Sequence, residues 1–277
     1  MTASNPPIRL TPSAAIVGSI RQAAQTTDVD FGLLMAQAQQ ESGFRADAKA
    51  SGSSATGLFQ FIDSTWLGLV RQFGDKYGVG ALAGTISVDS AGRPSVADPA
   101  TRQRILDLRE DPRLSSALAA EYARLNKGEL ERTLGRPVGN TDIYLAHFLG
   151  AHGAATFLTA LAQHGDTPAA DLLPEAAQAN HGVFYDGLTG RARSLADIYR
   201  SFGKRIEGDA ARFSDPAVPA SSAHVPSPES SAAARVLSFD PRRLSSPLAA
   251  MLNLFAFSAL HLLGGEAQAP HAFRRSL

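Results

Sequence analysis

Glu41 is the residue of this sequence whose position most suggests acid chemistry. Leu34, Ala38 and Glu41 recur at helical spacing, so a carboxyl group stands on the apolar stripe of an expected helix. An apolar environment disfavours the charged form of a carboxyl group and helps it to keep a proton near neutral pH. A general acid that breaks a glycosidic bond needs this property. For a glutamate taken alone, a solvated position at a helix end is more common than a buried catalytic position. The neighbouring residues are therefore needed to distinguish the two.

The loop after Glu41 supplies a second informative stretch, "SSATGLFQF". Gly57 permits close approach of the backbone, and Gln60 offers both a donor and an acceptor to an amide or a sugar hydroxyl. Taken alone, this stretch is more typical of a Gly/Ser loop that enters a helix. Together with Glu41 it favours a carbohydrate site.

Helical periodicity predicts the elements that position these groups. Asp30 is expected to cap a helix over Phe31–Ser42, which ends at Gly43 in a left-handed cap. Further helices are predicted over residues 12–25 after a Thr11 cap, from Asp63, over 100–108, from Pro112, over 141–150, over 154–163 and from Ser194.

Residues 74–99 are expected to form a surface insertion and not a core helix. Glycines interrupt the helical pattern there, and "TISVDSAGRPSV" is expected to form a small hairpin that turns near Ala91 and Gly92. The sequence therefore predicts a mainly α domain with long loops and a small β-hairpin.

Composition excludes several classes of function. Lys and Arg number 26 and Asp and Glu also number 26, so no net field favours nucleic acid or anionic lipid. Cysteine is absent, which excludes disulfides and thiolate metal sites. His147 and His152 do not share a helix face, so we expect no metal and no cofactor. The N-terminus has no basic start followed by an apolar run, and we expect no standard export signal.

The chain divides by composition into three parts. Residues 1–206 are expected to form the compact domain, residues 207–246 a Pro/Ser/Ala-rich linker, and residues 247–277 an apolar C-terminal segment. That segment is shorter than the roughly 20 apolar residues of a membrane span and contains polar residues. Docking on the domain or on a partner protein is therefore favoured over membrane attachment.

The order of three short motifs carries a resemblance to a known family. "ESGF", then "GLFQF" and "STW", are similar to the catalytic domain of the soluble, lysozyme-like lytic transglycosylases, over roughly residues 10–205. The resemblance implies a lysozyme-like helical fold and makes Glu41 the sole catalytic carboxylate. It places further substrate-binding residues beside Glu41 and along a sugar groove: Ser42, Gly57, Leu58, Phe59 and Gln60.

The match departs from the family on later helices. Where the family commonly carries Ala-Tyr-Asn, this chain has Ala146, His147 and Phe148. A groove role for His147 and a place in the core are equally open. The family also has a tyrosine close to the catalytic glutamate.

Two tyrosines and an asparagine near the end of the domain are candidates for these later groove positions. Tyr185 is the first candidate for the tyrosine near Glu41, and Tyr199 is the second. Asn180 is expected to face the groove as well. Aromatic residues at such places are more often part of the core.

The resemblance implies cleavage of the bond between N-acetylmuramic acid and N-acetylglucosamine in peptidoglycan, with formation of a 1,6-anhydro ring. Two alternatives stay open. A muramidase that hydrolyses the bond would need a second carboxylate, for which Asp63 and Asp142 are candidates, although both are better explained as helix caps or first-turn charges. A non-catalytic glycan-binding or scaffold protein would bind without cleaving.

The substrate implies a periplasmic or envelope location. Export would then use a dedicated secretion or flagellar apparatus, to which the segment 247–277 would dock, or a start codon upstream of this sequence. Glycan strands and this apparatus are the expected partners.

Overall fold

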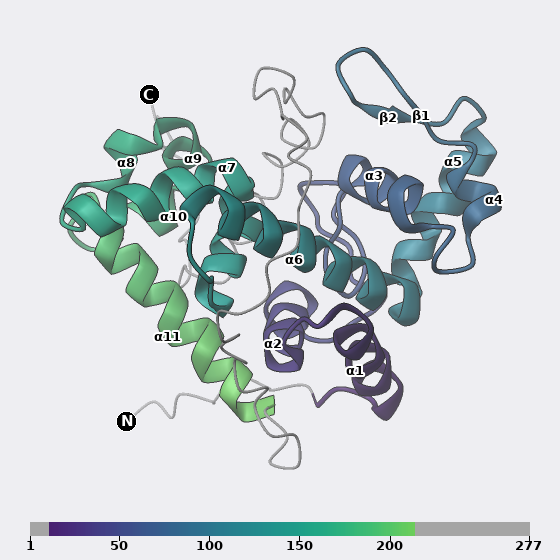
Figure 1. Ribbon diagram of the computed structural model, residues 1–277, viewed down its shortest axis with the longest axis horizontal. Coiled ribbons are helices and arrows are strands. Elements are labelled where there is room, and N and C mark those ends of the chain that lie inside the picture. Colours follow the sequence, from purple (N-terminus) through teal and green to yellow (C-terminus); the bar gives the residue numbers. More distant parts are fainter. Residues whose placement is uncertain (1–10, 214–277) are drawn as a thin grey trace, which may run out of the picture.

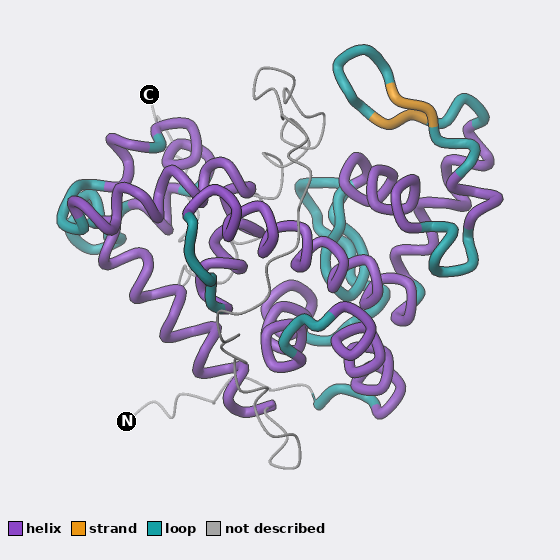
Figure 2. The backbone as a smooth tube through the Cα atoms, viewed as in Figure 1, coloured by secondary structure: helices purple, strands orange, loops and turns teal. Residues whose placement is uncertain are grey.

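The computed structural model describes residues 11–213 as a mainly helical fold (Figure 1). Figure 2 shows that helices make up most of this part and that two short strands form a single hairpin. The predicted mainly α, lysozyme-like fold is confirmed. The N-terminal residues 1–10, most of the predicted linker and the apolar segment 247–277 lie outside the described residues.

The first two helices are set by their caps. α1 (Ala14–Thr27) begins after Ser13, whose hydroxyl accepts a hydrogen bond from the Ile16 N–H, so the predicted Thr11 cap is wrong. α2 (Phe31–Ser42) is capped by Asp30, which accepts from the Leu33 N–H at 2.7 Å, as predicted. Gly43, with φ 59°, ends α2 in the left-handed conformation. Glu41 therefore lies in the last turn of a well-defined helix.

The middle of the chain follows the predicted order. α3 (Asp63–Phe73) is followed by the short α4 (Gly80–Ala83), which was not predicted. Strands β1 (Ser87–Val88) and β2 (Pro94–Ser95) pair antiparallel, and Figure 1 shows this hairpin projecting from the body of the molecule. α5 (Pro99–Asp107) and the 3₁₀ helix η1 (Leu108–Glu110) then lead back to the core. The predicted surface hairpin is confirmed.

Two long helices form the centre of the fold. α6 (Pro112–Leu134) begins at Pro112, as predicted, after a cap at Asp111, and it packs against α1 and α7. α7 (Asn140–His164) consists of two helical parts that meet in a kink at Gly150, whose φ 73° and ψ 159° are not helical. The helix end predicted at Gly150, with a further helix after it, is therefore confirmed.

Within the described residues, α7 meets the criteria of length and apolar composition for a helix that crosses a membrane. Of its most apolar window, 61% is buried inside the fold. The core accounts for the apolarity of α7.

The last helix covers α2. After the short helices α8 (Ala169–Leu172), α9 (Pro174–Ala179) and α10 (His181–Phe184), α11 (Leu195–Phe213) runs back across the molecule and packs on α2 and α7 (Figure 1).

Contacts near its end show that α11 belongs to the fold over its whole length. A Cβ on Gly32 would lie 2.8 Å from the carbonyl oxygen of Ala210, and the rings of Phe44 and Phe213 meet edge to face at 5.8 Å. The domain end predicted at residue 206 is too early, because residues 207–213 are helical and packed.

Candidate active site

A carboxyl–imidazole pair joins the end of α2 to α7. Oε1 of Glu41 lies 3.3 Å from Nε2 of His147. The Glu41 side chain is 10% exposed and that of His147 is 12% exposed. Glu41 is therefore mostly withdrawn from water, and one of its oxygens is held by a partner. A small exposed fraction remains through which a substrate could reach the carboxyl group.

Two buried tyrosines hold the imidazole of His147. The ring of Tyr144 stacks on it, with centroids 6.0 Å apart and planes at 24°, and Tyr122 meets it edge on at 6.2 Å. Burial raises the pKa of the Tyr144 phenol, and the nearby Glu41 carboxylate raises it further. Tyr144 is therefore a neutral phenol that lies within the electrostatic reach of Glu41.

Tyr144 was not among the predicted site residues. It precedes His147 by three positions on the same helix, and residues at this spacing share a helix face. That spacing was the signal available in the sequence.

A small cavity adjoins His147 between four elements. It is lined by Gln37 of α2, Phe59 of the loop between α2 and α3 (residues 43–62, here called the motif loop), Tyr122 and Asn126 of α6, and His147 itself. Two of the predicted site residues, Phe59 and His147, therefore line the same cavity although 88 positions separate them in the chain.

Ser42 connects α2 to the motif loop. Its hydroxyl lies 3.1 Å from the Ala38 carbonyl oxygen and 2.8 Å from that of Leu58. The side chain is buried, and its hydrogen is used within the protein. Ser42 thus fixes the loop to the helix turn that carries Glu41, and it offers substrate no free donor in this arrangement.

The Gly57–Gln60 segment forms a tight turn. The Gln60 N–H donates to the Gly57 carbonyl, and the Gln60 side-chain amide donates to the carbonyls of Ala48 and Gly57 at 3.0 and 2.9 Å. Gln60 itself adopts φ 48°, which is uncommon for a residue with a side chain. The amide N–H groups that were expected to bind a sugar are used to hold the loop.

The apolar residues of the same motif are buried. Leu58 is 0% exposed and Phe59 is 2% exposed. They anchor the loop in the core, and Phe59 reaches the cavity beside His147.

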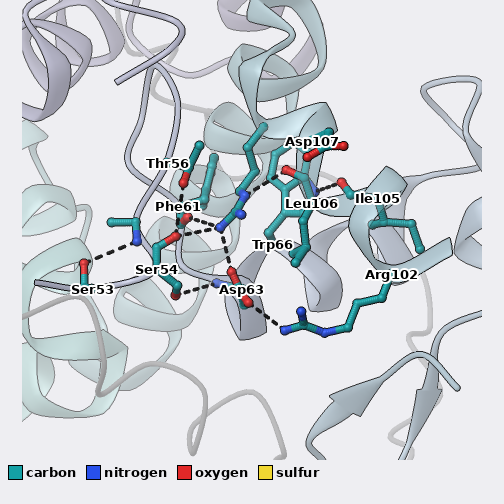
Figure 3. A network of polar contacts seen from close by, with 12 residues as sticks. Ser53, Ser54, Thr56, Phe61, Asp63, Trp66, Arg102, Ile105, Leu106 and Asp107 are labelled. Atoms are coloured by element: carbon teal, nitrogen blue, oxygen red, sulfur yellow. Dashed lines mark hydrogen bonds and ion pairs between the residues drawn. The ribbon is translucent and has the colours of Figure 1, made fainter. Parts of the chain in front are cut away.

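Arg109 of η1 binds Ser54, Phe61 and Asp63, which Figure 3 shows close together. Its guanidinium donates to the carbonyl oxygens of Ser54 and Phe61 at 2.7 and 3.1 Å, and to the carboxylate of Asp63 at 2.8 Å. Burial lowers the pKa of Arg109, although the negative charge of Asp63 acts in the opposite direction and raises it. A buried cation therefore binds the chain on both sides of the turn at residues 57–60.

The two carboxylates considered as a second catalytic group are both engaged in ion pairs. Asp63 binds Arg109 and, through its other oxygen, Arg102 at 2.6 Å, in place of the predicted cap. The N-cap of α3 is Ile62.

Asp142 is engaged in a second set of contacts. It accepts from Arg136 at 2.9 Å and from the Tyr199 hydroxyl at 2.8 Å, and its side chain is 3% exposed. Within residues 11–213 there is no group of three or more His, Asp or Glu side chains that could hold a metal ion.

The remaining predicted residues lie in other environments. Tyr185 stacks on His181 with centroids 4.4 Å apart, and the hydroxyl of Tyr199 is bound to Asp142. Asn180 is fully buried, and its amide N–H donates to the Ala176 carbonyl, so the expected groove contact is not supported. Burial and, in addition, the Glu41 carboxylate raise the pKa of Tyr144, which was not among the predicted residues.

The sequence of residues 18–81 matches the family model described as the transglycosylase SLT domain. The match takes in most of α1, all of α2 and α3, and the motif loop between them. It supports a glycan-cleaving function of the lytic transglycosylase type, with cell-wall peptidoglycan as substrate and an envelope location. The segment of the chain that carries Glu41 is thus similar to the transglycosylase SLT domain.

Proposed function

We propose that this protein cleaves the β-1,4 bond between N-acetylmuramic acid and N-acetylglucosamine, with Glu41 as the single general acid and base. The product would carry a 1,6-anhydro-muramic end. The observation that supports this proposal is the difference in environment between Glu41 and the two other candidate carboxylates. Glu41 is largely buried with one oxygen held by His147, whereas Asp63 and Asp142 are bound in ion pairs.

The proposed reaction needs one carboxyl group in two roles. Protonated Glu41 gives its proton to the oxygen that leaves the muramyl C1, and positive charge develops on the sugar ring. The resulting carboxylate then takes the proton of the muramyl C6 hydroxyl, whose oxygen bonds to C1. The C1–O bond to the next sugar is broken, a C1–O6 bond is formed, and Glu41 is protonated again.

Hydrolysis is the less favoured reaction. An inverting hydrolase places a second carboxylate roughly 6.5 to 9.5 Å from the acid to activate water. Both candidates would first have to leave strong ion pairs, and Asp142 is also almost fully buried. The ring-closing route requires neither step.

The test is mass spectrometry of the products released from peptidoglycan sacculi by the protein and by its Glu41→Gln variant. Glu129→Gln serves as a matched control, because Glu129 is an exposed glutamate on α6. Anhydro-muropeptides released by the wild type and the control, but not by Glu41→Gln, would support the proposal. Reducing-end products would show a hydrolase, and binding without any product would show a glycan-binding protein.

We propose that the protein reaches the envelope because residues 247–277 dock on a secretion or flagellar apparatus. These residues lie outside the described part of the chain. A deletion that starts at residue 214 tests the idea, because it keeps α11 complete. Unchanged targeting after this deletion would contradict it.

A further inference from the structure

We propose that His147 is a positioning residue that holds the Glu41 carboxyl group by one oxygen and makes glycan cleavage depend on the protonation of its imidazole. The inference rests on the proposed function and concerns the regulation of the same site. It gives His147 a role through Glu41, in place of the substrate contact expected from the sequence.

The geometry directs His147 toward one oxygen of Glu41. Its Nε2 is 3.3 Å from Oε1, and the ring cannot tilt freely because Tyr144 stacks on one side and Tyr122 meets it edge on. A ring packed in this way loses little conformational freedom when it orients a partner. The second oxygen of Glu41 is then left for the substrate.

Among the charged and titratable groups around His147, Glu41 is the one whose protonation changes in the proposed reaction. The other groups are Tyr122 on α6, Tyr144 on α7 and, next to Tyr144, Arg205 on α11. Burial raises the pKa of both phenols, which stay neutral over the range in which an imidazole titrates.

Each protonation state of the imidazole has a different consequence for the two proton transfers. A neutral ring with hydrogen on Nε2 donates to Oε1, so the other oxygen can give its proton to the leaving group and later recover one from the C6 hydroxyl. A protonated ring places a full positive charge beside the carboxylate. This charge stabilises the ionised form and weakens Glu41 as the base for the C6 hydroxyl. Turnover should therefore fall as the ring becomes protonated.

The first test compares the pH dependence of anhydro-muropeptide release by the wild type and by His147→Asn. The amide cannot titrate, so the acidic limb of the profile should disappear, and the rate at the optimum should fall about tenfold for the loss of a hydrogen bond to a charged group. His152→Asn is the matched control, since His152 is exposed on the same helix, and it should keep the wild-type profile. An unchanged acidic limb in His147→Asn would overturn the inference.

The second test follows the imidazole itself by NMR in the wild type and in Glu41→Gln. Removal of the carboxylate should change the chemical shifts of the His147 ring, whose Nε2 lies 3.3 Å from Oε1 of Glu41, whereas those of the His152 ring should stay constant. Unchanged chemical shifts of the His147 ring would overturn the pairing even if the enzyme is active. Changed shifts, together with a wild-type protein that releases no anhydro-muropeptides, would support the pairing and overturn the proposed function.

Discussion

The backbone of Gly57 lies directly against the backbone of Arg109. A Cβ built on Gly57 would stand 2.1 Å from the Arg109 carbonyl oxygen, and Gly57 has φ 85°. The Arg109 side chain binds the carbonyls of Ser54 and Phe61 on either side of the same turn. The motif loop is thus wrapped around one arginine. The loop in turn fixes the end of α2 that carries Glu41.

Gly57→Ala should destabilise the protein by about 3 kcal/mol or more, since the new methyl group meets backbone and the left-handed conformation is strained for alanine. Denaturant unfolding measures the change. Gly52→Ala is the control in the same loop, because a Cβ placed on Gly52 would have open space around it to a distance of 4 Å. Equal stability of the two variants would contradict the proposed close approach.

Arg109→Met should cost about 3 kcal/mol, because it leaves the loop carbonyls and part of Asp63 without their buried partner. Arg104→Met, at an exposed site on α5, should change stability little. Thermal unfolding compares the two. Equal destabilisation of the two variants would contradict the role of Arg109 in holding the loop.

Ser42→Ala should destabilise the protein by about 1 kcal/mol, because the Leu58 carbonyl loses its donor. Ser19→Ala removes a similar hydroxyl, which within the described residues donates to the Ala15 carbonyl on its own helix, and it should have a smaller effect. Turnover should also fall in the Ser42 variant, since the loop would no longer be fixed beside Glu41. Full activity together with wild-type stability would rule out this role.

Glu121 should make stability depend on pH. Burial alone would raise its pKa, but hydrogen bonds from Lys76, Arg124 and Tyr77 outweigh burial and hold the pKa below its ordinary value. A lowered folded-state pKa contributes stability that is complete above the unfolded-state pKa, about 4.3 for a glutamate, and that is lost as pH falls through the folded-state value.

Glu121→Gln should therefore be about 3 kcal/mol less stable than the wild type at neutral pH, and the difference should shrink as the solution is acidified below the glutamate range. Urea unfolding at a series of pH values measures it. The exposed Glu129→Gln should show a much smaller difference at each pH. A constant difference for Glu121→Gln down to low pH would contradict this linkage.

The end of α11 should be required for stability. A chain that stops after Ile206 loses the contact of Phe213 with Phe44 and that of Ala210 with Gly32. It should unfold at a lower temperature than a chain that stops after Phe213. Identical melting of the two chains would restore the boundary predicted at residue 206.

Local patterns determined the helices and the place of Glu41. Asp30 and Gly43 set the limits of α2 because their hydrogen bonds and dihedral angles involve only residues within a few positions. The hairpin and the start of α6 were predictable for the same reason. The end of α11 was not, since the polar and small residues after 206 gain their stability by packing on α2.

The tertiary structure alone decided how the motif residues are used. Gln60 and Ser42 have the right groups for sugar binding, but the carbonyls they satisfy belong to the folded loop. Likewise the Glu41 carboxylate raises the pKa of Tyr144, because the packing of α2 against the later helices, a long-range property, brings the two residues near each other. The sequence by itself placed an acid at the end of a helix, and only the fold selected His147 as its partner.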